Sequence, residues 1–172
     1  LAKPIEHCIT LEQGFTAELV FGLVLQNIQN DPSFLAIHEQ CNVEPALINC
    51  LKYVQEHKIL LQKLNVLAIQ MPDVFDQSLF CAWMTLCALT LEGRPQKELN
   101  VAFLAALTHD FGLLEVTPEI IFKTGELEPG EWVAMQQHPL LGARTLKNLC
   151  YDVDATAIRA VAEHHESPDG TG

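Results

Sequence analysis

Positive charge is scarce in this 172-residue sequence, which has 10 Lys and Arg residues against 22 Asp and Glu residues and a net charge of −12. A protein that holds nucleic-acid duplexes through their phosphates needs a basic stripe, so the composition argues against this class. A small anionic substrate is compatible with it, because one cationic pocket or bound metal ions would supply the charge that such a substrate needs.

Long apolar runs are lacking as well. The sequence contains no stretch of about 18 consecutive apolar residues, so we predict no membrane span. Its first residues lack the basic start and apolar core of a secretory signal, and we therefore expect a cytoplasmic protein. The hydrophobic content of 49% is nevertheless ample for a packed core.

Closely spaced cysteine pairs are also missing. The 6 cysteines are scattered and form no Cys-x-x-Cys motif, and four of them fall at apolar positions of expected helices. Reduced thiols in the core are therefore a better interpretation than disulfides or a zinc knuckle.

No convincing run of alternating polar and apolar residues indicates a β-strand, whereas helical spacing occurs nearly everywhere. The predicted fold class is all-α. Caps, prolines and glycines mark the helix ends, beginning with a capping box at Thr10 and Gln13. The expected helices cover residues 10–30, a short stretch after 31, 44–71, 73–91 and 96–110, then begin at 118 and 129, and end with 154–165.

Met71-Pro72 is the predicted domain boundary, which separates residues 1–71 from residues 72–172. The apolar stripe from Leu47 to Leu67 makes the first part a candidate for a regulatory module that forms a homodimer or binds a protein partner. Packing within one chain explains the same stripe better. Both tryptophans, Trp83 and Trp132, are expected in the core.

The residues that attract chemical attention lie in the second half. His109-Asp110 ends the apolar run of residues 101–107, where a buried carboxylate needs hydrogen bonds, a counter-charge or a metal. His138, the pair His164-His165 and an Asp-Gly-x-Gly turn at residues 169–172 follow. Each signal is weak alone, since a single helical histidine is usually an ordinary core or surface residue.

Two adjacent pairs favour a site with two ions. Neighbouring helical residues point about 100° apart, so a pair does not easily clamp one ion but can serve two that lie side by side. Asp110 is the natural bridging ligand. With nitrogen and oxygen ligands, iron or manganese is favoured, and zinc, nickel or cobalt stays open.

Four segments then resemble, in order, the motifs of the HD-GYP branch of the HD superfamily of metal-dependent phosphohydrolases. They are HDFGL at 109–113, IFKTGELEPGEW at 121–132, HPLLGAR at 138–144 and HHESPDGTG at 164–172. The resemblance covers about residues 73–172. It implies an all-α helical bundle of the HD type, here with an N-terminal helical extension, and two or three divalent ions. It also implies hydrolysis of a cyclic dinucleotide, cyclic di-GMP above all, in bacterial signalling.

The resemblance also implies roles for individual residues. The expected metal ligands are His109, Asp110, His138, His164 and His165, with His109 and Asp110 also at the catalytic centre. Asp73 and Gln77 occupy the places of two further ligands. Lys123 and Arg144 are candidate phosphate contacts, although a solvated surface role is the more ordinary interpretation.

Two departures from the family pattern, at Gln77 and Leu113, support an alternative, a degenerate domain that binds a nucleotide or a protein without turnover. Gln77 replaces a histidine, which weakens one metal site. Leu113 replaces a lysine that would stabilise charge at the scissile phosphate. The Tyr-Pro that follows the last motif in the family is not part of the sequence.

Overall fold

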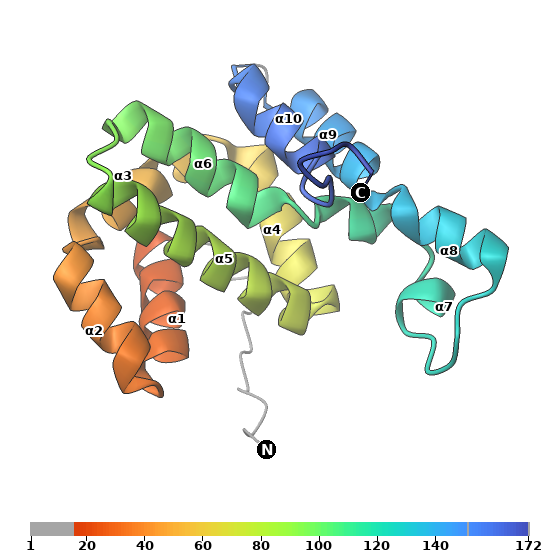
Figure 1. Ribbon diagram of the computed structural model, residues 1–172, viewed down its shortest axis with the longest axis horizontal. Helices are drawn as coiled ribbons and strands as arrows, with labels where there is room; N and C mark the ends of the chain where they lie inside the picture. Colours follow the sequence, from red (N-terminus) through yellow and green to blue (C-terminus); the bar gives the residue numbers. More distant parts are fainter. Residues whose placement is uncertain (1–15, 151, 172) are drawn as a thin grey trace.

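The structure, a computed structural model, describes residues 16–150 and 152–171. All regular structure in these residues is helical, which confirms the predicted all-α class (Figure 1). The elements are α1 (Ala17–Gln29), α2 (Pro32–Cys41), α3 (Glu44–Gln55), α4 (Lys58–Gln70), α5 (Pro72–Leu91), α6 (Gln96–Thr108), the 3-10 helix η1 (Phe111–Glu115), α7 (Pro118–Ile121), α8 (Pro129–Gln136), α9 (His138–Leu149) and α10 (Ala155–Ala162).

Most predicted helix starts are confirmed, because capping residues and prolines act locally. Asp31 accepts a hydrogen bond from the Ser33 amide in front of α2, and Pro32 occupies the first helical position. Thr16 is the N-cap residue of α1, and its hydroxyl accepts a hydrogen bond from the Leu19 amide. The capping box expected at residues 10–13 lies outside the described residues.

The single helix predicted for residues 44–71 is wrong, since the chain breaks into α3 and α4. The Glu56 and His57 amides close a tighter last turn on carbonyls three residues back, and His57 leaves helical geometry with φ −99° and ψ 79°. The apolar spacing hid this break because both helices bury their apolar faces in the same core. After the break Leu60 is fully buried, whereas the expected Leu61 is only partly buried.

Helix α5 lies at the centre of the molecule and packs against α1, α2, α3, α4 and α6. Its Trp83 is fully buried, as predicted, and donates a hydrogen bond from Nε1 to Nδ1 of His38 at 3.1 Å. By length and composition α5 could cross a membrane, but the core helix of a folded protein passes the same test. Its nearly uniform apolarity follows from its central place.

The hydrophobic core is continuous across the predicted boundary at residue 71. Leu64 and Leu67 of α4 belong to the same buried cluster as Phe75 and Leu79 of α5. A shared core does not test the division into residues 1–71 and 72–172, which stays a prediction. A homodimer or partner contact through the first helices also stays a prediction. Among the described residues all cysteines are free, and most of them are buried, which agrees with core thiols.

Helices α7 and α8 form an arm that projects from the body (Figure 1). The prediction that Trp132 lies in the core is wrong, because 54% of this residue is exposed. Phe122 and Val133 on the same arm are also largely exposed. Glu128 and Glu131 form a capping box that opens α8, so the arm owes its helix to local polar contacts and not to burial.

Candidate metal centre

His109 and Asp110 lie where α6 ends. The preceding turns bury Phe103, Leu104 and Leu107 completely, which fixes the position and direction of the helix end. His109 is the C-cap residue, and Asp110 follows with φ −95° and ψ 11°, outside the helix. The sequence predicted that both residues belong to the helix. Instead, the chain turns out of the helix at this pair and into the centre of the site.

His138 is the first residue of α9, and a close backbone contact brings it next to Asp110. A Cβ atom at Gly112 would lie 1.8 Å from the His138 carbonyl oxygen, so only glycine fits there. Gly142 faces it from α9, and a Cβ atom at Gly142 would lie 3.1 Å from the Gly112 nitrogen. The Thr145 hydroxyl also donates to the Glu115 carboxylate, which ties α9 to η1 a second time.

His164 and His165 come from the end of α10. The predicted helix to residue 165 is wrong, because α10 ends at Ala162 and the two histidines lie in the following turn. Leaving the helix lets both imidazoles reach the same side. Asp154 caps the start of α10 as predicted, through a hydrogen bond from the Thr156 amide.

Three of the imidazoles are oriented in the same way. Nδ1 of His109, His138 and His164 lies 2.8 Å from the backbone carbonyl three residues earlier, at Ala106, Met135 and Val161, respectively. A carbonyl only accepts, so Nδ1 carries the proton and donates. In the neutral imidazole Nε2 then presents a lone pair, which is the form that binds a metal.

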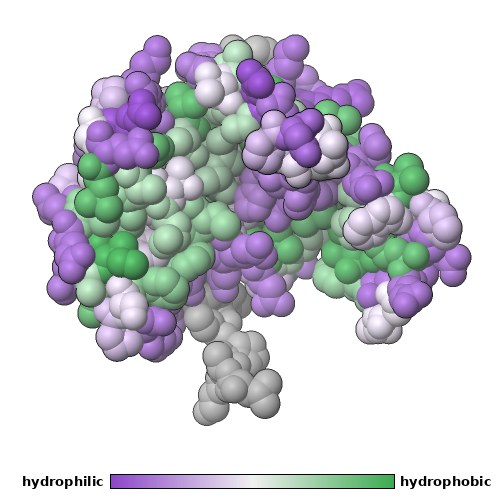
Figure 2. Space-filling model, in the orientation of Figure 1, coloured by the Kyte–Doolittle hydropathy of each residue, from purple (hydrophilic) through white to green (hydrophobic). Residues whose placement is uncertain are grey.

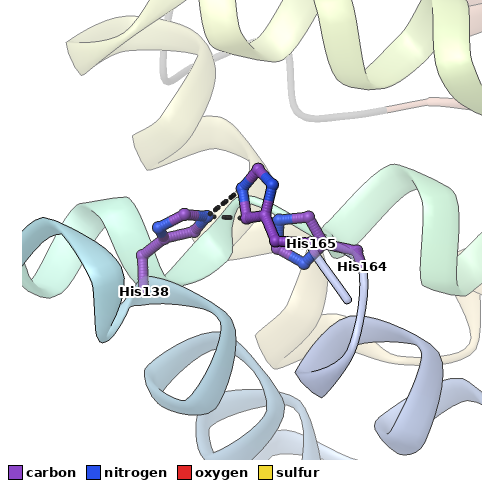
Figure 3. Close-up of side chains that lie close together, drawn as sticks. All are labelled: His138, His164 and His165. Atoms are coloured by element: carbon purple, nitrogen blue, oxygen red, sulfur yellow. Dashed lines mark hydrogen bonds between the residues drawn. The ribbon is translucent and has the colours of Figure 1, made fainter. Parts of the chain in front are cut away.

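The Nε2 atoms converge at one place (Figure 3). Nε2 of His138 lies 3.2 Å from Nε2 of His164 and 3.2 Å from Nε2 of His165. The ligand atoms of these three histidines all lie within 4.8 Å of one another. When both rings are neutral, the proton of His138 and of His164 lies on Nδ1, so the contact between their Nε2 atoms opposes two lone pairs. A cation or a proton between them resolves that repulsion.

Asp110 presents one oxygen to each half of this cluster. Its Oδ2 lies 3.1 Å from Nε2 of His109, and its Oδ1 lies 3.4 Å from Nε2 of His138 and 3.6 Å from Nε2 of His164. The two oxygens of one carboxylate thus face two different sets of imidazoles. This is the arrangement expected of a ligand that bridges two ions.

The electrostatics keep Asp110 ionised. Burial opposes its charge, but the close contacts with His109, His138 and His164 outweigh burial and hold the pKa of this carboxyl well below its usual range. Burial likewise opposes charge on His109 and His138, yet the Asp110 carboxylate raises the pKa of both imidazoles. Burial, followed by repulsion from His164 and His138, lowers the pKa of His165. The centre therefore places one ionised carboxylate, Asp110, among the imidazoles.

The remaining candidates do not join this cluster. Asp73 and Gln77 are exposed on α5, and none of the hydrogen bonds or ion pairs found in the described part of the chain links them to it. Lys123 pairs with Glu131 on the arm, where its ammonium lowers the pKa of that carboxyl. Arg144 is exposed on α9. The roles predicted for these four residues stay predictions.

Cys81 is a neighbour of the centre that the sequence did not single out. It lines a cavity of about 460 Å³ together with His109 and His164. Burial, then the charge of Asp110, raises the pKa of its thiol. Its position four residues after Gln77 on one helix was the available signal, since residues spaced i, i+4 share a helix face.

Family membership follows from a comparison that is independent of this geometry. The family model described as HD domain matches residues 50–172, which include all five converging side chains. The chain belongs to the HD domain family. This match confirms the predicted membership of the HD superfamily. The side chains of His109, Asp110 and the later histidines thus converge within the HD domain of this chain.

Three relatives illustrate the similarity. A cyclic di-GMP phosphodiesterase of Pseudomonas aeruginosa is 39% identical over 92 residues, 54% of this chain and 22% of the relative. The 3′3′-cGAMP-specific phosphodiesterase 3 of Vibrio cholerae is 41% identical over 68 residues, 40% of this chain and 14% of the relative. A cyclic di-GMP phosphodiesterase of Thermotoga maritima is 30% identical over 89 residues, 48% of this chain and 24% of the relative.

The chain therefore spans less than a quarter of the length of each of these relatives. No solved structure shows significant similarity to the chain.

Proposed function

We propose that this HD domain is a metal-dependent phosphodiesterase that hydrolyses a cyclic dinucleotide, with cyclic di-GMP as the first candidate, in the manner of the HD-GYP branch. The observation that carries the proposal is the opposition of imidazole lone pairs around one ionised carboxylate, which calls for cations at that place. The names of the relatives supply the class of substrate. The cytoplasmic location stays a prediction that suits such a substrate.

The donor set fits two divalent ions. His109 with one Asp110 oxygen would hold one ion, and His138, His164 and His165 with the other oxygen would hold the second. These nitrogen and oxygen donors favour iron or manganese, with zinc, nickel and cobalt as alternatives. Bound ions of this kind lower the pKa of water and neutralise charge on phosphoryl oxygens. A third ion would need further ligands, for which Asp73 and Gln77 remain the proposed residues.

The protein's own part is to orient the donor atoms and to supply negative charge. The carbonyls of Ala106, Met135 and Val161 hold three imidazoles with Nε2 turned inward, so that their donor atoms need no rearrangement. Asp110 supplies the negative charge that a pair of cations requires. Leu113 packs against the core and supplies no cation of its own. Charge stabilisation at the phosphate is therefore proposed to rest on the ions.

The alternative of a degenerate domain without turnover is not favoured. It depended on Gln77 and Leu113, whereas the five side chains at the centre are all present and converge. The relatives that the chain resembles are named as phosphodiesterases.

The test is an Asp110→Ala variant of the full-length protein. Removing the shared ligand should lower both bound metal and hydrolysis of cyclic di-GMP by more than about 100-fold, since even residues that only support a ligand commonly cost 10- to 100-fold. Metal analysis and product chromatography measure the two losses. Glu126→Ala, which removes an exposed carboxylate from the loop before α8, is the matched control and should change neither. Equal metal content and equal turnover in Asp110→Ala would end the proposal.

A further inference from the structure

A second cavity adjoins the metal centre on the side of the arm. It has a volume of about 570 Å³ and lies among α8, the start of α9 and the turn after α10. His138 and His165 form one of its walls, so the cavity and the cluster share two imidazoles. Small-molecule sites commonly have volumes of about 300 to 1,000 Å³, which makes this cavity large enough for a nucleobase.

Aromatic and apolar side chains also line this cavity. Trp132 lines it with Met135 and Leu140, and Trp132 and Leu140 are 54% and 60% exposed, respectively. Hydrophobic surface is accordingly visible over the arm in Figure 2. Contiguous exposed apolar surface of this kind often marks a ligand-binding groove. The indole of Trp132 offers a flat face on which a base can stack.

Besides His138 and His165, two polar side chains line the cavity. Glu166 lines it with an exposed side chain, and its carboxylate takes part in none of the hydrogen bonds or ion pairs found among residues 16–150 and 152–171. A carboxylate only accepts hydrogen bonds. Guanine presents adjacent N–H donors on its Watson–Crick edge, whereas adenine presents a ring acceptor there. Gln136, the other polar residue, can donate or accept and does not discriminate.

We propose that this cavity is a guanine subsite, in which the base stacks on Trp132 and its Watson–Crick edge donates to Glu166. The proposal rests on the proposed function and adds to it the base that the site selects. A nucleotide has one ribose between its base and its phosphate. A guanine held in this cavity would therefore have its phosphate near His138 and His165, which line the same cavity. In this arrangement Trp132 of the arm holds the base, and Glu166 after α10 selects it.

The first experiment measures kcat and KM for cyclic di-GMP in full-length wild type, Trp132→Ala and Trp132→Phe. Loss of the indole should raise KM roughly 10-fold, by the usual worth of base–aromatic stacking, and phenylalanine should restore most of it. Val133→Ala, the neighbouring exposed residue that does not line the cavity, is the matched control. Bis(p-nitrophenyl) phosphate, which has no Watson–Crick edge, reports on the metal centre and should be hydrolysed by all variants. An unchanged KM in an active Trp132→Ala would overturn the subsite.

The second experiment tests the choice of base. Wild type should prefer cyclic di-GMP over cyclic di-AMP, and Glu166→Gln should reduce that preference at least about 10-fold, because an amide can pair with either edge. A preference that Glu166→Gln leaves intact would remove Glu166 from the proposal. If wild type hydrolyses neither dinucleotide nor the simple diester, the proposed function fails separately. Tryptophan fluorescence then decides on the subsite: quenching by cyclic di-GMP that vanishes in Trp132→Phe supports it, and its absence refutes it.

Discussion

The body of the molecule and its arm use apolar side chains in opposite ways. In α1 to α6 most of the large apolar residues are buried in one core, and Trp83 is completely enclosed in it. In α7 and α8, Phe122, Trp132 and Val133 are 61%, 54% and 57% exposed. The same residue type thus stabilises the fold in one region and forms accessible surface in the other. The metal centre lies between the two, at the ends of helices that the body holds in place.

The largest effect on stability is expected from a substitution in the core that leaves the metal centre intact. Trp83→Ala removes a fully buried indole and leaves Nδ1 of His38 without its donor, which should lower the free energy of unfolding by about 3 to 5 kcal/mol. Urea unfolding measures this loss, with the partly exposed neighbour in Met84→Ala as control. Bound metal per folded molecule should stay unchanged. Loss of metal from folded Trp83→Ala would show that core and centre are not separable.

The second largest effect is expected at the backbone contact between Gly112 and His138. Gly112→Ala places a Cβ atom 1.8 Å from the His138 carbonyl oxygen, so η1 and α9 must move apart. We expect a loss of roughly 2 to 3 kcal/mol in unfolding free energy, and much weaker metal binding because His138 moves with α9. Gly125→Ala is the control, since its Cβ atom would meet nothing within 4 Å. Metal titration of both variants would contradict this account if their affinities were equal.

The smallest effect should come from the arm. Phe122→Ser replaces a residue that is 61% exposed, so the free energy of unfolding should change by no more than about 0.5 kcal/mol. The same denaturation assay measures it. A loss comparable to that of Trp83→Ala would mean that the arm is packed in solution, and the contrast between the two regions would disappear.

The sequence predicted helices well where the signals are local. Asp31, Pro32 and Gly93 mark boundaries that the structure has, because caps, prolines and a residue with φ +69° act on their immediate neighbours. It did not predict the break at His57, since apolar spacing is the same for one long helix and for two helices on one core. It also placed Trp132 in the core, because hydrophobicity alone does not say which surface of the fold a residue meets.

The centre was predictable for a different reason. The motifs singled out His109, Asp110 and the three later histidines, and the structure brings all five together, although their role as ligands stays a proposal. What the sequence could not show is the contact that assembles them. The approach of Gly112 to α9 depends on how two segments pack, and spacing along the chain carries no information about it.

The three carbonyls that accept from Nδ1 have a consequence for ion selection. Each lies three residues before its histidine, so these three imidazoles are oriented by their own stretches of backbone before any ion arrives. Flexible side chains lose rotational entropy when they are captured, and here folding has already removed most of it. Such a rigid set of donors would select divalent ions by coordination geometry and ligand type, not by the general affinity series alone. The cell's supply of each ion would act together with this selection.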